Sequence, residues 1–288
     1  MNELAPIAFR KMNGLGNDFV VIDAREIAVD ISPQAARLIS DREGGVGCDQ
    51  LIVIERALRA DAVMRIFNAD GGEVEACGNA TRCVALLLAQ ESEHADIDIR
   101  TKAGTLVCRV HEDGSVTVDM DEPRFDWRDI PLAEEFRDTR AIELQIGPID
   151  DPVLHSPSVV NVGNPHCIFW VDDVAAHDLE RFGPLLENHP VFPERANISL
   201  AHVTARDAIT LRTWERGVGL TKACGTAACA AQAAAARRNL TGRTATVTLP
   251  GGDLEIEWRE DDNHLLMTGP VEFEFEGLLA PQFFESGG

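Results

Sequence analysis

The chain has 288 residues, enough for two domains of ordinary size, and its composition is that of a soluble globular protein. Its 26 basic and 48 acidic residues give a net charge of −22, which opposes binding to nucleic acid and to anionic membranes. The N-terminal residues lack a signal-peptide core, and no run reaches the roughly 20 apolar residues of a membrane span. We therefore expect a cytoplasmic protein that binds neither nucleic acid nor membrane.

Seven cysteines are present, an odd number, and none follows the C-x-x-C spacing. A disulfide framework and a structural zinc site are both disfavoured by this pattern. We expect free thiols and no bound metal.

The first half of the chain is predicted to be rich in β-strands. A helix should begin at Ser32-Pro33, with Ser32 as the N-cap and Pro33 as the first helical residue. Asp113-Gly114 marks a hairpin between two alternating runs. Apolar and β-branched runs predict strands at residues 19–22, 51–54, 63–67, 97–100, 105–110 and 116–120.

The second half repeats this order after a stretch rich in acids and prolines at residues 121–151, which resembles a connecting region more than a core. A helix interrupted at Gly183-Pro184 is expected at residues 174–186. Strands are expected at residues 167–171, 198–203, 209–214, 245–249, 254–258 and in an alternating tail at 271–275. We predict domains at residues 1–124 and 125–270, with residues 271–288 completing the first.

A short stretch occurs twice and indicates an internal duplication. Residues 75–83 read E-A-C-G-N-A-T-R-C and residues 222–229 read K-A-C-G-T-A-A-C. Cys224 follows Cys77 by 147 residues, and the same offset relates Gly16-Asn17 to Gly163-Asn164 and Gln50 to Asn197. A shared offset at three separated polar sites favours two half-sites of one enzyme.

Each Cys-Gly pair is followed by an alanine-rich segment without proline, which predicts a helix that begins just after the cysteine. The helix macrodipole and free amides should lower the pKa of such a thiol and favour thiolate near neutrality. The amides at Gly78-Asn79 and Gly225-Thr226 could bind one substrate carboxylate. A buried structural role is the alternative for either cysteine alone, but the matching contexts of Cys77 and Cys224 favour shared chemistry.

The other cysteines and the polar clusters have simpler interpretations. Turn formation explains any single cluster of Asn, Asp and Gly, although together the clusters could line one cleft. These clusters lie at residues 13–17, 68–72, 163–166 and 215–217. Structural roles are assigned to Cys48, Cys83, Cys108, Cys167 and Cys229.

Four of these stretches closely resemble the diaminopimelate epimerase family: K-M-N-G-L-G-N-D-F, F-N-A-D-G-G-E-V-E-A-C-G-N, G-N-P-H-C and E-R-G-V-G-L-T-K-A-C-G-T. The resemblance runs from residue 11 to about 270. It implies an α+β fold of two pseudo-symmetric β-rich domains, each a curved sheet around a central helix, with the active site in the cleft between the halves. It also implies cofactor-independent inversion of one α-carbon of diaminopimelate between its LL and meso forms, in lysine and cell-wall precursor synthesis.

The resemblance assigns roles to individual residues. Cys77 and Cys224 match the two acid/base thiols, and His166 and Glu215 could tune them. A capping histidine and a surface salt bridge are the alternatives for the latter two. The α-carboxylate would be bound by the amides of Gly78, Asn79, Gly225 and Thr226, and the rest of the substrate by Asn13, Gln50, Asn68, Asn164, Asn197, Glu215 and Arg216.

Two thiols suit this chemistry, because inversion removes a proton from one face of a carbon and returns one to the other. Proton transfer by positioned groups gives about 10²- to 10⁴-fold in rate, so carboxylate binding and water exclusion must supply much of the rest. No pyridoxal-binding pattern is evident in the chain. We expect no cofactor.

The chain departs from the family pattern beside the thiols. Asn79-Ala80-Thr81 stands where a Gly-Ala pair usually follows the Asn, Ala227 replaces a customary Gly, and Leu220 stands where an acidic residue is common. The chain has no tyrosine, so any tyrosine-based dimer contact is absent. A homodimer is therefore possible, but the sequence does not decide the oligomeric state.

Two other functions remain open from the sequence. One is a related two-thiol racemase or isomerase, for example of proline-like substrates, for which Arg216 and several Asn residues would be excessive. The other is a noncatalytic thiol-redox protein, which predicts a stable disulfide as the working state.

Overall fold

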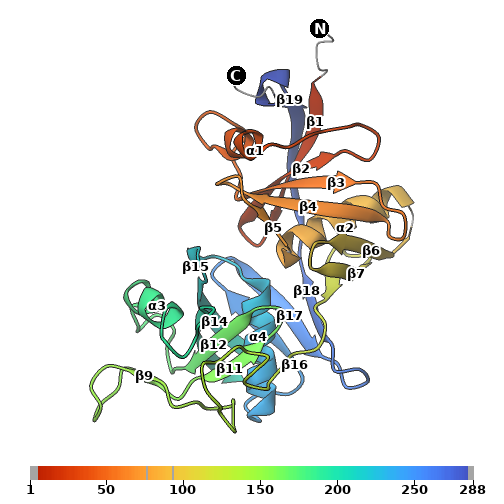
Figure 1. The fold of residues 1–288 in the computed structure, drawn as a ribbon. Coiled ribbons are helices and arrows are strands. Elements are labelled where there is room, and N and C mark those ends of the chain that lie inside the picture. The colour runs from red at the N-terminus through yellow and green to blue at the C-terminus, as the bar shows by residue number, and fades with distance from the viewer. Residues whose placement is uncertain (1–5, 76, 93, 285–288) are drawn as a thin grey trace. The chain divides into compact units, whose positions relative to one another are not determined.

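The protein is described by a computed structural model over residues 6–75, 77–92 and 94–284. The chain divides into two compact units, one formed by Met1–Val118 with Gly269–Gly288 and the other by Asp119–Thr268. The boundaries expected from the sequence lay slightly further along the chain, after residues 124 and 270. Both units are rich in β-strands and contain few helices (Figure 1).

Unit 1 is built on a mixed sheet whose hydrogen-bonded neighbours run β19, β1, β2, β3, β4, β6, β7, β8, with the short β5 also on β4. Neighbours are antiparallel except for β2–β3 and β4–β6, which are parallel. The elements are β1 (Ile7–Gly14), β2 (Asn17–Asp23), α1 (Pro33–Ser40), β3 (Gln50–Glu55), β4 (Ala62–Asn68), β5 (Glu73–Val74), α2 (Gly78–Ser92), β6 (Asp96–Thr101), β7 (Gly104–Val110), β8 (Val116–Asp119), β19 (Glu272–Leu279) and the 3-10 helix η1 (Pro281–Phe283).

Unit 2 has the same plan, with neighbours in the order β11, β12, β13, β14, β16, β17, β18 and the short β15 also on β14. Here β12–β13 and β14–β16 are the parallel pairs. The elements are β9 (Gln145–Ile146), β10 (Leu154–His155), β11 (Ser158–Asn161), β12 (Pro165–Trp170), α3 (Leu179–Glu187), β13 (Asn197–Ala205), β14 (Ala208–Glu215), β15 (Gly219–Thr221), α4 (Gly225–Arg237), β16 (Thr244–Leu249), β17 (Gly252–Trp258) and β18 (Leu265–Gly269).

The predicted duplication is confirmed by the strand register. Phe19 pairs with Gln50 in unit 1, and His166 pairs with Asn197 in unit 2, each 147 residues later. The helices that follow the two Cys-Gly pairs begin at the equivalent residues Gly78 and Gly225. The two units therefore share both the order and the alignment of their strands.

Each unit places its sheet around one helix, as predicted. The helix α2 packs against β1, β2, β6 and β7, and α4 packs against β11 to β14, β16 and β17. In Figure 1, α4 lies among the strands of its unit. Its residues are nearly all alanine and are buried on every side from Ala227 to Ala235, because the small side chain lets strands approach from several directions. None of the described helices is long and apolar enough to cross a membrane.

The prediction for residues 174–186 was wrong in two respects. The helix α3 begins only at Leu179, after Asp178 caps it by accepting a hydrogen bond from the Arg181 amide, and it continues through Pro184. Gly183 explains this tolerance, because a Cβ there would lie 2.5 Å from the Trp214 ring. The close contact that the glycine allows stabilises the helix where proline removes a backbone hydrogen bond.

The stretch at residues 121–151 is part of the unit 2 core, so its interpretation as a connecting region was wrong. Four apolar side chains from this stretch are buried with Phe169 and Leu200: Ile130, Leu132, Ile142 and Leu144. The acids and prolines dominate the composition, but the isolated apolar residues decide the packing. Sequence analysis also missed several short or charged strands, namely β1, β5, β9, β10, β11, β15 and β18.

A tight hairpin joins β1 to β2 and sets the position of Asn17. Gly14 pairs with Asn17, and the two loop residues have positive φ angles, 61° at Leu15 and 81° at Gly16. Such angles are those of a type I′ turn, which matches the twist of the strands but is unfavourable for leucine. The Asn13 side-chain oxygen supports the turn by accepting a hydrogen bond from the Gly16 amide at 2.7 Å.

Candidate active site

Cys77 lies at the start of α2. Its carbonyl oxygen accepts hydrogen bonds from the Thr81 amide at 2.9 Å and from the Thr81 hydroxyl at 2.8 Å, which closes the first helical turn. The amides of Gly78 and Asn79 are therefore the first of the helix, at the positive end of its macrodipole. The thiol is partly exposed, and its sulfur lies 4.0 Å from the Asn17 side-chain oxygen.

Cys224 occupies the equivalent place before α4, where its carbonyl accepts a hydrogen bond from the Ala228 amide at 3.1 Å. The residue is only 5% exposed, and its sulfur lies 3.5 Å from the Thr226 hydroxyl. Both predicted helix starts are thus present, but the two thiols differ in their access to solvent.

The predicted lowering of the thiol pKa is wrong for Cys224. Burial raises the pKa of this thiol well above its ordinary value, and the neighbouring Glu215 carboxylate raises it further. The hydrogen bond with Thr226 lowers the pKa but does not offset these two effects. The cause is tertiary, because the loss of water around a buried thiolate outweighs the favourable helix terminus. Cys224 is a thiol in the unliganded protein near neutral pH.

Glu215 ends β14 and shares a hydrogen bond with Cys224, while the Thr221 hydroxyl donates to Glu215 Oε1. Burial raises the pKa of the Glu215 carboxyl, and the hydrogen bonds with Thr221 and Cys224 oppose this shift. The interpretation of Glu215 as a surface salt bridge was wrong, since its partners are a hydroxyl and a thiol. A carboxyl with a raised pKa and a thiol partner is suited to exchange a proton with that thiol.

His166 is fully buried on β12, so it is not a capping histidine. Burial lowers its pKa to about 3, and the positive charge of Arg216 contributes to the lowering. The ring is therefore neutral at physiological pH. Its Nε2 lies 2.7 Å from the Asn164 side-chain oxygen and 3.4 Å from the Asn197 side-chain nitrogen, and the shorter contact, with an acceptor, assigns the proton to Nε2. The buried Nδ1 has no hydrogen-bond partner among the described residues and is left as an acceptor.

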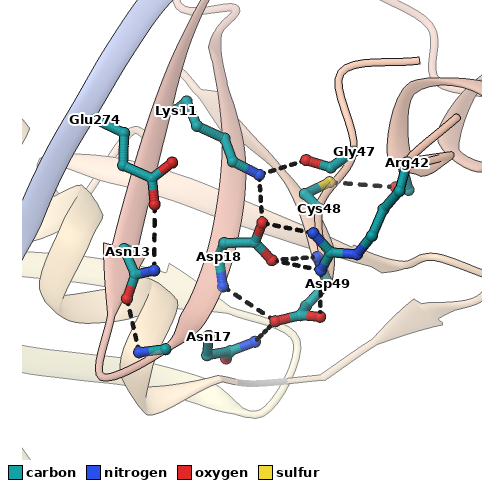
Figure 2. Close-up of polar contacts among 11 residues, drawn as sticks. Lys11, Asn13, Asn17, Asp18, Arg42, Gly47, Cys48, Asp49 and Glu274 are labelled. Carbon is teal, nitrogen blue, oxygen red and sulfur yellow. Dashed lines mark hydrogen bonds and ion pairs between the residues drawn. The ribbon is translucent and has the colours of Figure 1, made fainter. Parts of the chain in front are cut away.

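Two of the predicted amides of unit 1, Gln50 and Asn68, are in contact, and Asn13 has other partners. Gln50 Nε2 donates to the Asn68 side-chain oxygen at 2.9 Å, across the β3–β4 pair, while the buried Gln50 Oε1 has no partner within the described part of the chain. Asn13 lies at the β1–β2 hairpin, and its side-chain nitrogen donates to Glu274 Oε1 at 3.2 Å (Figure 2). A buried oxygen without a donor is costly, so Gln50 is a candidate acceptor for a substrate ammonium group.

In unit 2, Asn197 and Arg216 are joined through the loop that follows β14. The Asn197 side-chain oxygen accepts a hydrogen bond from the Arg216 amide at 2.9 Å, and Asn197 itself is buried. Arg216 Nη1 donates to the Glu194 carbonyl at 2.9 Å. This arrangement fixes the backbone of Arg216 while its guanidinium retains further N–H groups that can bind a carboxylate.

The comparisons with known proteins agree with this duplicated arrangement. The family model described as "Diaminopimelate epimerase" matches the chain twice, at residues 9–125 and 158–274. A diaminopimelate epimerase of Nitrobacter hamburgensis is 57% identical over 289 residues, covering 99% of both chains. The chain belongs to the diaminopimelate epimerase family.

A second relative in this family, from Brucella anthropi, is 60% identical over 278 residues, covering 95% of this chain and 92% of the relative. Solved structures show the same fold at low identity. A phenazine biosynthesis protein of the PhzF family from Bacillus anthracis has a TM-score of 0.68 at 17% identity and covers 96% of this chain and 99% of its own. A hydroxyproline epimerase from Agrobacterium vitis has a TM-score of 0.65 at 14% identity, covering 96% and 92%.

Three residues at the site of this family member were missed by sequence analysis. They are Asn17, Asp49 and Glu187. Asn17 contacts Cys77 and donates a hydrogen bond to Asp49. Glu187 is 5% exposed and accepts hydrogen bonds from the Trp214 indole at 2.7 Å and from the Gly217 amide at 2.9 Å. Glu187 thus ties α3 to the loop of Arg216. The 147-residue offset was a signal for Asn17, since it relates Asn17 to Asn164. Nothing local distinguishes Glu187 from an ordinary helix-terminal acid.

Proposed function

We propose that this protein, as a member of its family, interconverts LL- and meso-diaminopimelate by moving a proton at one α-carbon, with Cys77 and Cys224 as acid and base. The observation that carries the proposal is the occurrence of a cysteine at an equivalent helix start in each duplicated unit. One thiolate removes the α-proton, and the other thiol donates a proton to the opposite face of the carbon. The class of enzyme is an isomerase that serves amino-acid biosynthesis.

The helix starts would bind the α-carboxylate during this reaction. The amides of Gly78-Asn79 and Gly225-Thr226 begin α2 and α4, and the positive end of each helix favours an anion. Hydrogen bonds to this carboxylate strengthen as negative charge develops on deprotonation of the α-carbon. This provides local stabilisation of an anion in a chain with a net charge of −22.

Glu215 supports the basic role of Cys224. For Cys224 to act as a base, its own proton must first leave the sulfur, and the Glu215 carboxylate within hydrogen-bond reach can accept it. The raised pKa of Glu215 reduces the energetic difference between the two protonation states of the pair. His166 would act as a neutral hydrogen-bonding group, because its pKa of about 3 excludes a positive charge at neutral pH.

The distal end of the substrate would be recognised by Arg216 together with the amides of Asn13, Gln50, Asn68, Asn164 and Asn197. A planar guanidinium matches a second carboxylate, which diaminopimelate has and proline lacks. This distinction favours diaminopimelate over a proline-like substrate.

Purified protein should be incubated with LL-diaminopimelate and a reductant, and the isomers resolved by chiral chromatography. In deuterium oxide, early product should carry deuterium at the α-carbon while recovered starting isomer stays largely protiated. Activity should persist after treatment with a metal chelator. Inversion of proline without turnover of diaminopimelate would refute the substrate assignment, and protiated early product would refute the two-thiol mechanism.

A further inference from the structure

The side chain that contacts the Cys77 sulfur belongs to a connected chain of hydrogen bonds in unit 1. Asn17 Oδ1 lies 4.0 Å from the sulfur and accepts a hydrogen bond from Asn79 Nδ2 at 3.4 Å. Asn17 Nδ2 donates to Asp49 Oδ2 at 2.8 Å. Asn79 Oδ1 in turn accepts from Arg82 Nη2 at 3.1 Å.

The two ends of this chain fix the orientation of both amides. Arg82 can only donate, so it must face the oxygen of Asn79, which turns the Asn79 amide nitrogen toward Asn17. The Asp49 carboxylate can only accept, so it must face the nitrogen of Asn17. The oxygen of Asn17 is therefore directed at both Asn79 and the Cys77 sulfur.

Asp49 is itself held by a cluster of charges, shown in Figure 2. Arg42 donates to Asp49 Oδ1 at 2.8 Å and to both oxygens of Asp18. Asp18 and Asp49 also accept each other's backbone amides at 3.0 Å. Lys11, buried on β1, completes the cluster through Asp18 at 2.5 Å. Within this cluster two cations and two carboxylates balance, so the cluster fixes Asn17 without adding a net charge of its own.

Unit 2 does not contain the same chain, which indicates that this arrangement serves Cys77 in particular. Asn164 is the equivalent of Asn17, but its oxygen accepts from His166. The equivalent of Asp49 is Ala196, so no carboxylate is available there. Cys224 interacts with Glu215 instead.

We propose that Asn17 is a positioning residue for Cys77: its side-chain oxygen, held in place by Asp49, accepts the S–H hydrogen bond and favours the thiol over the thiolate. An acceptor oxygen attracts the S–H group and repels a sulfur anion, so it stabilises the proton-donating form. The effect of Asn17 on the acidity of Cys77 is independent of the proposed function, but its value for catalysis rests on that function.

Charged and titratable groups around this chain must be considered in its test. They are Lys11 from β1, Asp18 from β2, Arg42 and Asp49 from the segment before β3, and Arg82 and Cys83 from α2. Cys83 does not compete in titration near neutrality, because burial raises its pKa to about 12.

The test measures the rate at which iodoacetamide alkylates Cys77 as a function of pH, read by peptide mass spectrometry without substrate. Asn17→Leu removes the acceptor at similar side-chain volume, and Asp49→Asn removes the charge that orients it. Asp23→Asn is the matched control for Asp49→Asn. Asp23 is a partly buried carboxylate on β2, the strand that begins with Asn17, but it pairs with Arg25. The rate rises with pH as the thiol ionises, and the midpoint is the pH at which the rate is half its plateau at high pH. A change in access to the thiol alters the plateau rate, whereas a change in thiol acidity moves the midpoint.

Asn17→Leu should move the midpoint about one pH unit lower, so that alkylation below the midpoint is ~10-fold faster. Asp49→Asn should move it in the same direction by less, because the Asp49 side chain is 41% exposed and its charge is screened. Asp23→Asn should leave it unchanged. An unchanged midpoint in Asn17→Leu, or an equal shift in the control, would overturn the proposal.

Thermal melting identifies whether each variant is folded, and if Asn17→Leu is not, the Asp49→Asn midpoint alone decides. The readout needs no turnover. Failure of the wild type to invert diaminopimelate would therefore refute the proposed function and leave this result intact.

Discussion

The thiols of the two units occupy equivalent backbone positions in different surroundings. Cys77 is partly exposed and faces an amide oxygen, whereas Cys224 is buried and faces the Glu215 carboxylate and the Thr226 hydroxyl. The residue equivalent to Glu215 is Asn68, which bonds to Gln50 and not to a thiol. The duplication has thus preserved strand register and helix starts while the partners of the thiols have diverged.

This divergence indicates that the acidity of each thiol is set separately. In unit 2, a half-buried acid and a buried thiol share a hydrogen bond, and both have raised pKa values. In unit 1, the cluster of Lys11, Asp18, Arg42 and Asp49 is linked to the sulfur through Asn17, and its charges compensate one another. The helix starts are alike in the two units, and the side chains around each thiol provide the individual tuning.

The largest expected effect tests whether these unlike thiols are equally required. Cys77→Ala and Cys224→Ala should each lower the kcat for diaminopimelate inversion by roughly 10³-fold or more, because the proposed mechanism uses one thiol as the acid and the other as the base. Steady-state rates in both directions measure this. Cys48→Ala, a buried cysteine of unit 1 whose thiol contacts Ser40, is the control and should keep most of the activity. Substantial inversion by either active-site variant would show that one thiol suffices.

Glu215→Gln should break the carboxylate–thiol pair of unit 2. We expect kcat to fall about 10²-fold, since the acceptor for the Cys224 proton is lost. The alkylation midpoint of Cys224 should move to lower pH, because the Glu215 carboxylate raises the thiol pKa and glutamine carries no charge. The Cys77 midpoint should not change. Glu255→Gln, an exposed acid of the same unit, serves as the control. A Cys224 midpoint that stays in place would remove Glu215 from this role.

Arg216 marks another difference, since its equivalent in unit 1 is Ala69. Arg216→Lys should weaken diaminopimelate binding about 10-fold while changing kcat less, because an ammonium cannot reproduce the two parallel hydrogen bonds of a guanidinium. Calorimetry measures the affinity. Arg212→Lys is a matched control on β14, where the guanidinium donates to the Val174 carbonyl. Equal affinities of the wild type and Arg216→Lys would place the distal carboxylate elsewhere.

The smallest expected effect on kcat and on the alkylation midpoint concerns Thr226, whose equivalent in unit 1 is Asn79. Thr226→Val keeps the shape and the backbone amide but removes the hydroxyl 3.5 Å from the Cys224 sulfur. The hydroxyl lowers the Cys224 pKa, so its loss should raise the alkylation midpoint by a few tenths of a unit and lower kcat about 3-fold. Thr221→Val tests the hydroxyl on the other side of Glu215 for comparison. A downward midpoint shift for Thr226→Val would contradict the assigned hydrogen bond.

Features that depend on local sequence were predictable. The helix that begins after Ser32, the helix starts after both Cys-Gly pairs and most long strands lie where the pattern placed them. The duplication also followed from the spacing of a few polar residues. Local signals were sufficient because capping, propensity and alternation each act within one element.

Features that depend on packing between elements were not predictable in this way. The acidity of Cys224 was assigned the wrong direction, since nothing near it in sequence reports its burial. The continuity of α3 through Pro184 depends on a contact between Gly183 and Trp214, from a distant strand. Asn17 reaches Cys77 through strand pairing and a hairpin turn, so its role required three-dimensional placement.

The alanine composition of α4 has a consequence for the folding order of unit 2. Alanine has the highest intrinsic helix propensity but buries little area per side chain, so this helix depends less on its strands than most buried helices do. We expect α4 to be largely formed in the transition state for folding, with the strands condensing around it afterwards. Glycine substitutions in its middle would then slow folding more than they accelerate unfolding. The turn that carries Cys224 would be in place before the sheet that buries it has closed.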